Sequence, residues 1–177
     1  MNSRWWLQHL VKLGELEEAV PGVFTLPGRR AGPSQIALAL VSHSILGLAS
    51  ALWAHGLLAD EPVPVHLVIP HGGHASRQRK VPVRLWRSRE FCEGKICGGY
   101  RQDLVALPIE RTLVDCLRYR CGIPLERIEA VTLETLATQR TTVGGLIDAA
   151  DSVALRGQRR QFIEAVIERW RRAAANR

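Results

Sequence analysis

The sequence lacks any apolar run that approaches the roughly 18 residues needed to cross a membrane. Its first residues, MNSRWWLQHL, also lack the long apolar core of a signal peptide. Lysine is scarce, since only three of the 24 basic residues are lysine and the others are arginine. We therefore expect a cytoplasmic protein without a membrane partner, whose positive charge is carried by guanidinium groups.

Several chemical arrangements are also missing from the sequence. We find no glycine loop that would cradle phosphate, no nucleophile set beside a base, and no convincing set of metal ligands. His71 and His74 in HGGH have a spacing seen among ligands, but no acid or thiol stands nearby, so a turn is favoured. The sequence therefore predicts a protein that is not an enzyme and has no cofactor and no metal.

The four cysteines form two pairs with four intervening residues, namely Cys92 with Cys97 and Cys116 with Cys121. Paired cysteines are typical of zinc sites, although this spacing is at the loose end of the range. Cys116 lies in an apolar repeat with Leu113 and Leu117, where a thiol is usually a small core residue. We therefore favour packing over metal binding, and a reducing cytosol disfavours structural disulfides.

The chain has 177 residues, of which 46% are hydrophobic, and this is enough for one ordinary core with a small module beside it. The 24 basic residues exceed the 17 acidic ones and give a net charge of +7. Arginine contacts phosphate in bidentate fashion, so this excess favours a polyanionic partner. A genomic base bias toward arginine codons is the alternative explanation.

The N-terminal residues show the pattern of a helix followed by a small hairpin. Apolar residues recur at helical spacing over residues 3 to 13, and Gly14 provides a stop. ELEEAV and VFTL flank the turn pair PG, which predicts two short antiparallel strands. We interpret residues 1 to 27 as the second half of a winged helix, joined by the connector PGRRAGP to the rest of the chain.

The remainder, residues 34 to 177, predicts a mixed α/β domain with a helical C-terminal part, so the fold class is α+β. SQIALALVSHSILGLASALWAHGL predicts two helices, whereas PVHLVIP, VPVRLWRS and QDLVAL predict strands. After the segment PIERTLVDCLRYR, three more helices are expected, and the last of them carries an apolar stripe that ends at Trp170.

The segment PIERTLVD raises the question of acid–base chemistry, because it holds two acids close together. Glu110 and Asp115 are five residues apart, which turns them about 140° from each other on a helix. We therefore expect structural roles: Glu110 at the helix start, Arg111 reaching a carboxylate or carbonyl of the sheet, and Thr112 locking the turn. His55, next to the helix stop Gly56, is expected to bond the last carbonyls of its helix.

Four segments in order, LVKLGELEEAVPGVFTLP, SALWAHGL, VHLVIPHGG and IERTLVD, resemble the AbiEi antitoxin family of bacterial type IV toxin–antitoxin systems. The resemblance covers most of the chain. It implies a winged helix that binds operator DNA, followed by an α/β domain, in a regulator that neutralises a nucleotidyltransferase-like toxin. It also implies that residues 4 to 13 are the recognition helix and 15 to 26 the wing, whereas two preceding helices of the family are not found here.

The resemblance further implies a signature of seven residues in the second domain: Ser50, His55, Gly56, Glu110, Arg111, Thr112 and Asp115. Operator DNA and a cognate toxin are the expected partners, and the sequence leaves a homo-oligomer open. Loss of DNA binding with the absent helices is one alternative, which would leave a protein that acts only through residues 34 to 177.

The expected DNA-binding residues are Arg4, Gln8, His9 and Lys12 on the first helix and Arg29 and Arg30 in the connector. Such a helix can read base edges with Gln and Arg while Lys and the wing contact phosphate. The alternative is that these residues are the solvated side of an amphipathic helix.

A second basic cluster within residues 77 to 101 includes Arg77, Arg79, Lys80, Arg84, Arg87 and Arg89. In its strand, Arg84 and Trp86 are expected on one face, where a cation beside an aromatic ring could clamp single-stranded nucleic acid. A solvated sheet face is the plainer interpretation. The remaining alternative function is a nuclease or other nucleic-acid-processing enzyme that uses this cluster.

Overall fold

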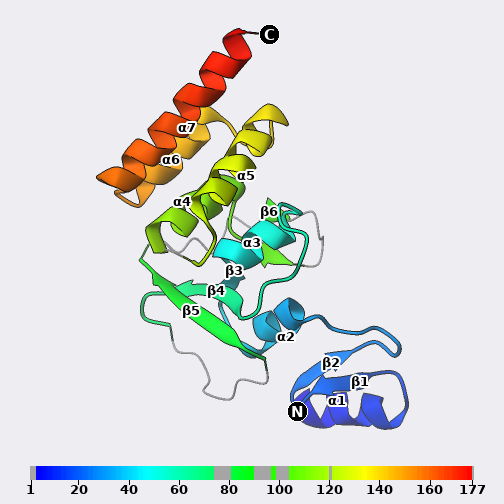
Figure 1. The fold of residues 1–177 in the computed structure, drawn as a ribbon. Coiled ribbons are helices and arrows are strands. Elements are labelled where there is room, and N and C mark those ends of the chain that lie inside the picture. Colours follow the sequence, from blue (N-terminus) through cyan, green and yellow to red (C-terminus); the bar gives the residue numbers. More distant parts are fainter. Residues whose placement is uncertain (1–2, 74–80, 90–96, 99–103, 120, 177) are drawn as a thin grey trace.

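The computed structural model describes residues 3–73, 81–89, 97–98, 104–119 and 121–176 (Figure 1). A helix and a two-stranded hairpin form the N-terminal end, a five-stranded mixed sheet with two helices follows, and four helices form the C-terminal part. The predicted α+β class is confirmed. Within the described ranges, no helix is both long enough and apolar enough to cross a membrane.

The N-terminal elements lie where the sequence predicts them. Helix α1 (Ser3–Lys12) ends before Gly14, whose φ of +75° only glycine adopts without strain. Strands β1 (Glu17–Val20) and β2 (Val23–Thr25) pair antiparallel across the predicted turn. A helix followed by a hairpin is therefore present, and its assignment as half of a winged helix stays a prediction.

The connector leads into helix α2 (Pro33–Leu40), which begins with proline because its first N–H needs no partner there. The side chain of Gln35 accepts a 2.9 Å hydrogen bond from the Gly32 N–H. Glu61 accepts a 2.7 Å hydrogen bond from the Ser34 N–H and thereby holds the first turn of α2 against a later loop.

The central sheet has the strand order β5-β4-β3-β7-β6. Its strands are β3 (Ile45–Leu46), β4 (Val65–Pro70), β5 (Val83–Ser88), β6 (Cys97–Gly98) and β7 (Val105–Ala106). The pairs β4 with β5 and β3 with β7 are parallel, whereas β3 with β4 and β6 with β7 are antiparallel.

The middle strand β3 was not predicted, because its two residues lie inside an apolar run of helical appearance. Helix α3 (Leu48–Ala54) follows β3 directly. A side chain at Gly47 would collide with Val68 on β4, so glycine is required where β3 passes into α3. As predicted, the chain leaves this helix at Gly56, with φ of +73°.

Four helices follow the sheet: α4 (Ile109–Tyr119), α5 (Leu125–Ala137), α6 (Val143–Ser152) and α7 (Gln158–Ala175). They lie at the end of the molecule opposite α1 (Figure 1). Ile163, Val166 and Ile167 of α7 are buried, so the predicted apolar stripe is confirmed.

Two apolar clusters lie on opposite sides of the sheet. Leu67 and Ile69 of β4 pack in one cluster with α2 and β7, whereas Val68 between them packs in the other with the C-terminal helices. This alternation follows from the two-residue period of a strand. Helix α3 contributes to both clusters, which places the segment between residues 48 and 57 at the centre of the fold.

Candidate functional site

Three of the predicted DNA-binding side chains lie on one side of α1. Arg4, Gln8 and Lys12 follow one another at intervals of four residues and are exposed. An interval of four residues advances about 40° around a helix, so the three lie within about 80°. His9 lies apart from them, half-buried, with its ring stacked on Trp5 at 5.4 Å between centroids and 4° between planes.

The aromatic side chains of α1 are unusually open. Trp5 is 61% exposed and Trp6 is 44% exposed, although Trp6 belongs to the apolar repeat of the helix. Trp6 contacts Trp5 edge to face at 5.9 Å, and no described element covers the pair. The helical pattern alone predicts no binding role for these two residues, and the only sign of one in the sequence is that they directly follow Arg4.

The hairpin carries acidic rather than basic side chains. Glu18 accepts a 2.7 Å hydrogen bond from the Gly22 N–H in the turn, and Glu17 accepts one of 3.4 Å from the Gly28 N–H. Residues 15 to 26 hold three glutamates and no lysine or arginine. A wing that settles on phosphate would need cations, so the hairpin itself contributes little attraction to DNA.

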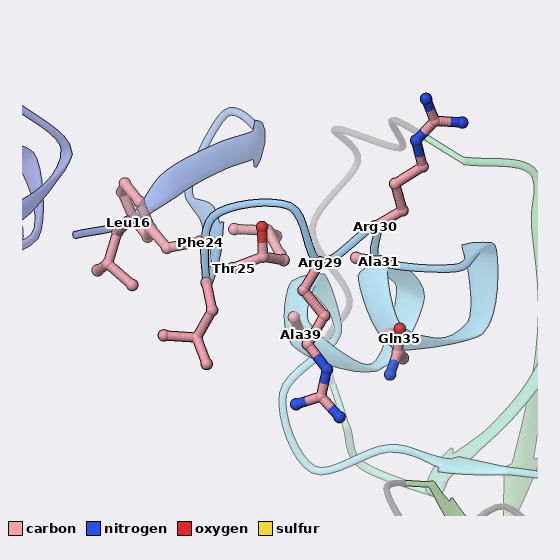
Figure 2. A pocket seen from close by; sticks show the side chains of 10 residues that line it. Leu16, Phe24, Thr25, Arg29, Arg30, Ala31, Gln35 and Ala39 are labelled. Carbon is pink, nitrogen blue, oxygen red and sulfur yellow. The ribbon is translucent and has the colours of Figure 1, made fainter. Parts of the chain in front are cut away.

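A hollow of about 380 Å³ lies between β2, the connector and α2 (Figure 2). Its lining includes the apolar side chains of Leu16, Phe24 and Leu26 together with Arg29 and Arg30. Figure 2 shows the two arginines leaving the connector in different directions. They therefore form no single clamp but extend the positive charge of the connector to two sides.

Of the second basic cluster, Arg77, Arg79 and Lys80 lie outside the described residues. The other three members, Arg84, Arg87 and Arg89, are exposed on or just after β5. In the sequence, positive charge is concentrated in this stretch: residues 71–103 hold eight cations and three acids, whereas residues 1–33 hold four cations and three acids.

Arg84 and Trp86 lie on the same face, as predicted, with the guanidinium carbon 5.9 Å from the ring centre. The ring of Trp86 is nevertheless half-buried, because it packs against Tyr119 of α4 at 4.9 Å and His66 of β4 at 6.0 Å. Trp86 is therefore part of the packing between sheet and helix. The strand pattern predicted an exposed Trp86 ring on which a base could stack. Because the ring lies largely under α4, little of it is open for such stacking.

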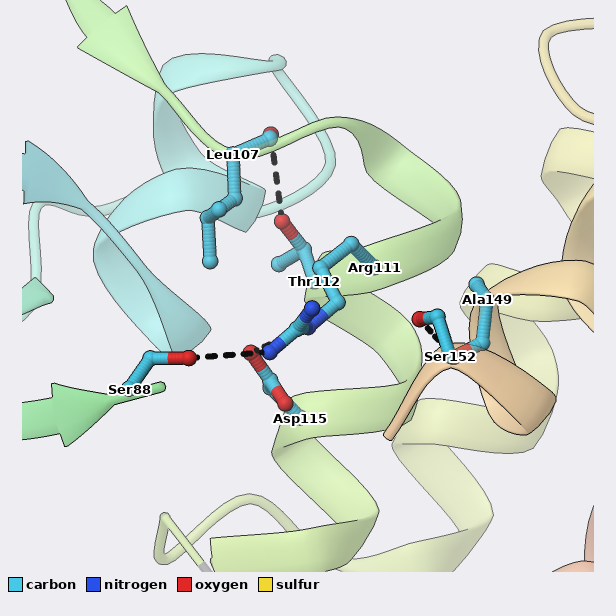
Figure 3. A network of polar contacts seen from close by, with 7 residues as sticks. All are labelled: Ser88, Leu107, Arg111, Thr112, Asp115, Ala149 and Ser152. Carbon is cyan, nitrogen blue, oxygen red and sulfur yellow. Dashed lines mark hydrogen bonds and ion pairs between the residues drawn. The ribbon is translucent and has the colours of Figure 1, made fainter. Parts of the chain in front are cut away.

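Three residues of the predicted signature on α4, Arg111, Thr112 and Asp115, form polar links near the start of the helix (Figure 3). Arg111 donates from Nε to Asp115 Oδ2 at 2.9 Å and from a terminal nitrogen to Ser88 Oγ on β5 at 3.2 Å. Thr112 donates its hydroxyl to the Leu107 carbonyl at 3.2 Å. The locking of the turn by Thr112 agrees with its predicted role. Arg111 does reach the sheet, but its partner there is the hydroxyl of Ser88, and the carboxylate that it binds is that of Asp115 on its own helix.

Glu110 links two helices. Its carboxylate accepts a 2.8 Å hydrogen bond from the hydroxyl of Thr141, just before α6 begins, and its side chain occupies the space that a side chain at Gly145, in the first turn of α6, would need. The predicted position at the start of α4 is correct, but the hydrogen bond reaches the segment that leads into α6. Glu110 and Asp115 have separate partners and do not share a proton.

The expected role of the His55 side chain was wrong. His55 does end α3, but its Nε2 lies 2.7 Å from the Leu107 carbonyl oxygen and not at a carbonyl of its own helix. Burial, with the charge of Arg140 as a smaller cause, lowers its pKa, so the imidazole is neutral near pH 7. The carbonyl oxygen of Leu107 also accepts the hydrogen bond from the Thr112 hydroxyl, so His55 at the end of α3 and Thr112 of α4 bind the same atom.

The other two members of the signature also have structural positions. Ser50 is fully buried in α3, and its hydroxyl accepts a 2.9 Å hydrogen bond from the His66 N–H on β4. Gly56 terminates α3. The signature therefore joins α3, the sheet and α4, and chemically it is suited to holding these elements in place.

In the described part of the chain, no three metal-ligating side chains come together. His74 and Cys92 lie outside that part, so the HGGH and first cysteine patterns are not described. The cysteines of the second pair are adjacent and buried, as favoured by their apolar repeat. The apolar repeat predicts that these cysteines pack in the core, but it gives no sign that the two thiols interact.

The fold defines a mixed α+β protein with an N-terminal helix and hairpin. No protein-family model and no curated protein matches the chain. Among solved structures, the fold is similar to the crystal structure of the RV2827C protein from Mycobacterium tuberculosis, with a TM-score of 0.63 and 16% sequence identity. The match covers 96% of this chain and 66% of that one, so this chain spans less than two thirds of its length; the likeness shows the fold alone.

Proposed function

We propose that this chain is an antitoxin-like transcriptional regulator that docks α1 on operator DNA and binds a nucleotidyltransferase-like toxin through residues 34 to 177. The observation that carries the DNA-binding half is the exposed row of Arg4, Gln8 and Lys12 on one side of α1. The resemblance of four ordered segments to the AbiEi family supports the choice of class.

Each side chain of the row has a distinct task on DNA. A glutamine amide can pair with the N6 and N7 edge of adenine, so Gln8 is the residue that distinguishes base pairs. Arg4 and Lys12, one turn away on either side, neutralise phosphates and fix the position of the helix. Arg29 and Arg30 add phosphate contacts from the connector. The hairpin adds none, because its charged side chains are glutamates.

The DNA-binding half is tested by fluorescence anisotropy with a labelled duplex from upstream of the gene, at several salt concentrations. Lys12→Ala should lower the salt slope by about one and weaken binding to all sequences alike. Gln8→Ala should reduce discrimination against a scrambled duplex by about 1 to 3 kcal/mol. Arg171→Ala, an exposed arginine on α7, is the control with the same charge change.

Two results would overturn this half of the proposal. One is equal weakening by Lys12→Ala and Arg171→Ala, which would mean that only net charge matters. The other is a wild-type protein that binds the operator and the scrambled duplex equally well, which would leave α1 as a packing element.

The antitoxin half is tested by co-expression with a neighbouring nucleotidyltransferase-like gene. Growth should be restored by the wild type, and it should still be restored by Gln8→Ala because that variant alters only the DNA-reading side of α1. Failure of the wild type to restore growth would remove the toxin from the proposal without affecting the DNA measurement.

A second candidate function is favoured by the distribution of charge. Because residues 71–103 hold most of the excess cations, this region, with Arg84 and Arg87 exposed on β5, is suited to nucleic-acid backbones. Arg84→Ala and Arg87→Ala together should weaken binding to single-stranded RNA or DNA more than Lys12→Ala does. Cleavage of either substrate with added divalent metal would favour a nucleic-acid-processing enzyme instead.

A further inference from the structure

Cys116 and Cys121 lie together where helix α4 ends. Residues five apart in an unbroken helix point about 140° away from each other. Here α4 ends at Tyr119, and Gly122 with φ of +87° turns the chain. Cys121 lies just beyond the end of the helix, and its thiol donates a weak hydrogen bond of 3.9 Å to the carbonyl oxygen of Cys116.

The two thiols share one buried environment but differ in access. Cys116 is 1% exposed and Cys121 is 7% exposed, and both belong to the apolar cluster between the sheet and the C-terminal helices. Both are reduced, so the pair is a dithiol held in position by the surrounding core. Cys121 is the less buried of the two residues and is therefore the one that we expect a small molecule to reach first.

Ionisation is easier at Cys121 than at Cys116, although the S–H bond from Cys121 to the Cys116 carbonyl oxygen is lost when Cys121 ionises. A hydrogen bond from Cys116 lowers the pKa of Cys121 to about 7, against the opposing effect of burial, and backbone N–H groups and the charge of Arg84 also contribute. The same hydrogen bond raises the pKa of Cys116, with burial and the negative charges of Cys121 and Asp115 as further causes. A thiolate is the nucleophile in sulfur chemistry.

We propose that Cys116 and Cys121 form a reversible redox site that reacts with hydroperoxides. The Cys121 thiolate attacks a peroxide oxygen; the S–O bond forms, the O–O bond breaks, and hydroxide leaves and is protonated to water. The Cys116 sulfur then attacks the resulting sulfenic acid, the S–S bond forms, and a second water leaves with the Cys116 proton. With hydrogen peroxide, two thiols lose two electrons and the peroxide becomes two waters.

A reversible pair is compatible with a reducing compartment, where disulfides are transient and signal redox state. The site also adjoins the polar links of α4, because Cys116 directly follows Asp115, the partner of Arg111. Disulfide formation therefore acts on the helix that holds the signature residues together. Its chemistry is independent of the proposed DNA contacts, so each proposal can fail alone.

The test uses the full chain with Cys92→Ser and Cys97→Ser, which leaves only the proposed pair. Under native conditions, hydrogen peroxide should consume two free thiols, and peptide mapping without reductant should find a Cys116–Cys121 disulfide that dithiothreitol reverses. The rate should rise as pH increases through about 7, as Cys121 ionises.

Single variants separate the two roles. Cys121→Ser should slow the reaction at least tenfold, on the order expected when a thiolate is replaced by an inaccessible thiol. Cys116→Ser should stop the reaction at a sulfenic acid on Cys121, which dimedone traps as a single adduct. Arg84→Gln should slow the reaction about twofold, because one contribution to the thiolate is lost.

The proposal is overturned if both thiols stay reduced in the folded chain and react only in denaturing urea. It is also overturned if the wild-type disulfide maps to Cys92 or Cys97, or if Cys121→Ser leaves the rate unchanged. Circular dichroism before oxidation shows whether each variant is folded. If a variant is not, the comparison of native with urea-denatured wild type decides the question.

Discussion

Large apolar side chains are mostly exposed or half-buried in the N-terminal helix and hairpin, whereas in the α/β domain they are mostly buried. In residues 4–26, Val23 is the only buried residue, and four large apolar side chains stand open: Trp5 at 61%, Trp6 at 44%, Leu13 at 59% and Leu26 at 58% exposure. In the domain, leucines such as Leu52, Leu113 and Leu146 are at most 1% exposed.

Polar groups differ between the two regions in the same way. In the domain, the buried carboxylate of Asp115 is paired with Arg111, and Glu110 binds Thr141 of a neighbouring segment. In the hairpin, Glu17 and Glu18 are exposed and bond only to backbone N–H groups of nearby turns. The domain therefore connects distant segments, whereas the hairpin stabilises only its own turns.

This difference indicates one region of the chain that is suited to contact other molecules. Adjacent exposed apolar and aromatic side chains are characteristic of interaction surfaces, and aromatic and arginine residues are enriched there. The N-terminal region has both features at Trp5, Trp6 and Arg4. The leucines compared in the domain belong to its buried core, so the same substitution should have very different effects in the two regions.

A matched pair of leucine substitutions tests this comparison most strongly. Leu113→Ala removes a side chain that is 1% exposed and should cost about 4 kcal/mol of unfolding free energy, because it leaves a cavity. Leu13→Ala removes one that is 59% exposed and should cost less than about 0.5 kcal/mol. Urea unfolding followed by circular dichroism measures both, and equal losses would contradict the proposed division.

A pair of acid substitutions tests the polar side of the comparison. Asp115→Ala should cost about 3 kcal/mol, because it leaves the guanidinium of Arg111, with 12% side-chain exposure, without its carboxylate. Glu18→Ala removes an exposed acceptor in the hairpin turn and should cost less than about 1 kcal/mol. The same unfolding measurement applies, and a larger loss for Glu18→Ala would reverse the assignment of scaffold and surface.

The domain should also respond to acid through a buried histidine. Burial, with a smaller effect of the Arg84 charge, lowers the pKa of His66 from 6.5 to about 4. Between these values the unfolded chain binds the proton and the folded chain does not, so stability is lost as pH falls. The loss attributable to His66 should be about 2 kcal/mol between pH 8 and pH 5.

The measurement is a series of urea unfolding curves from pH 8 to pH 5 for the wild type and His66→Gln. The variant removes the titrating group, so its stability should fall by about 2 kcal/mol less than that of the wild type over this range. If the wild type and the variant lose the same unfolding free energy between pH 8 and pH 5, His66 does not cause the acid response. Other groups, including His55, would then cause it.

Local patterns predicted most elements of the fold. The apolar periodicity of α7 and the proline-bounded strands β4 and β5 are properties of single segments, and the structure confirms them. Strand β3 could not be found in this way, because two residues show no period and their extended form depends on pairing with β4 and β7. Its register is a tertiary property.

The candidate site shows the same limit. The spacing of Glu110 and Asp115 correctly separated the two acids, since angles around a helix follow from sequence alone. The partners Ser88 and Thr141 could not be predicted, because they lie 23 and 31 residues away from the residues they bind. His55 was expected to bond the last carbonyls of its own helix. Its side chain instead bonds the carbonyl of Leu107, which is 52 residues away in the sequence.

The smallest expected effect concerns a single hydroxyl in each region. Thr141→Val keeps the shape of a buried side chain but removes the donor to Glu110, and it should cost about 1 kcal/mol. Thr25→Val in β2 removes a hydroxyl that lies 3.5 Å from the Glu17 carbonyl oxygen, so it should cost nothing measurable. Adding Glu110→Ala to Thr141→Val completes a double-mutant cycle in which a coupling of about 1 kcal/mol is expected. A coupling near zero would mean that the hydrogen bond between Glu110 and Thr141 does not help to join α4 and α6. The domain, like the hairpin, would then derive little stability from its polar side chains.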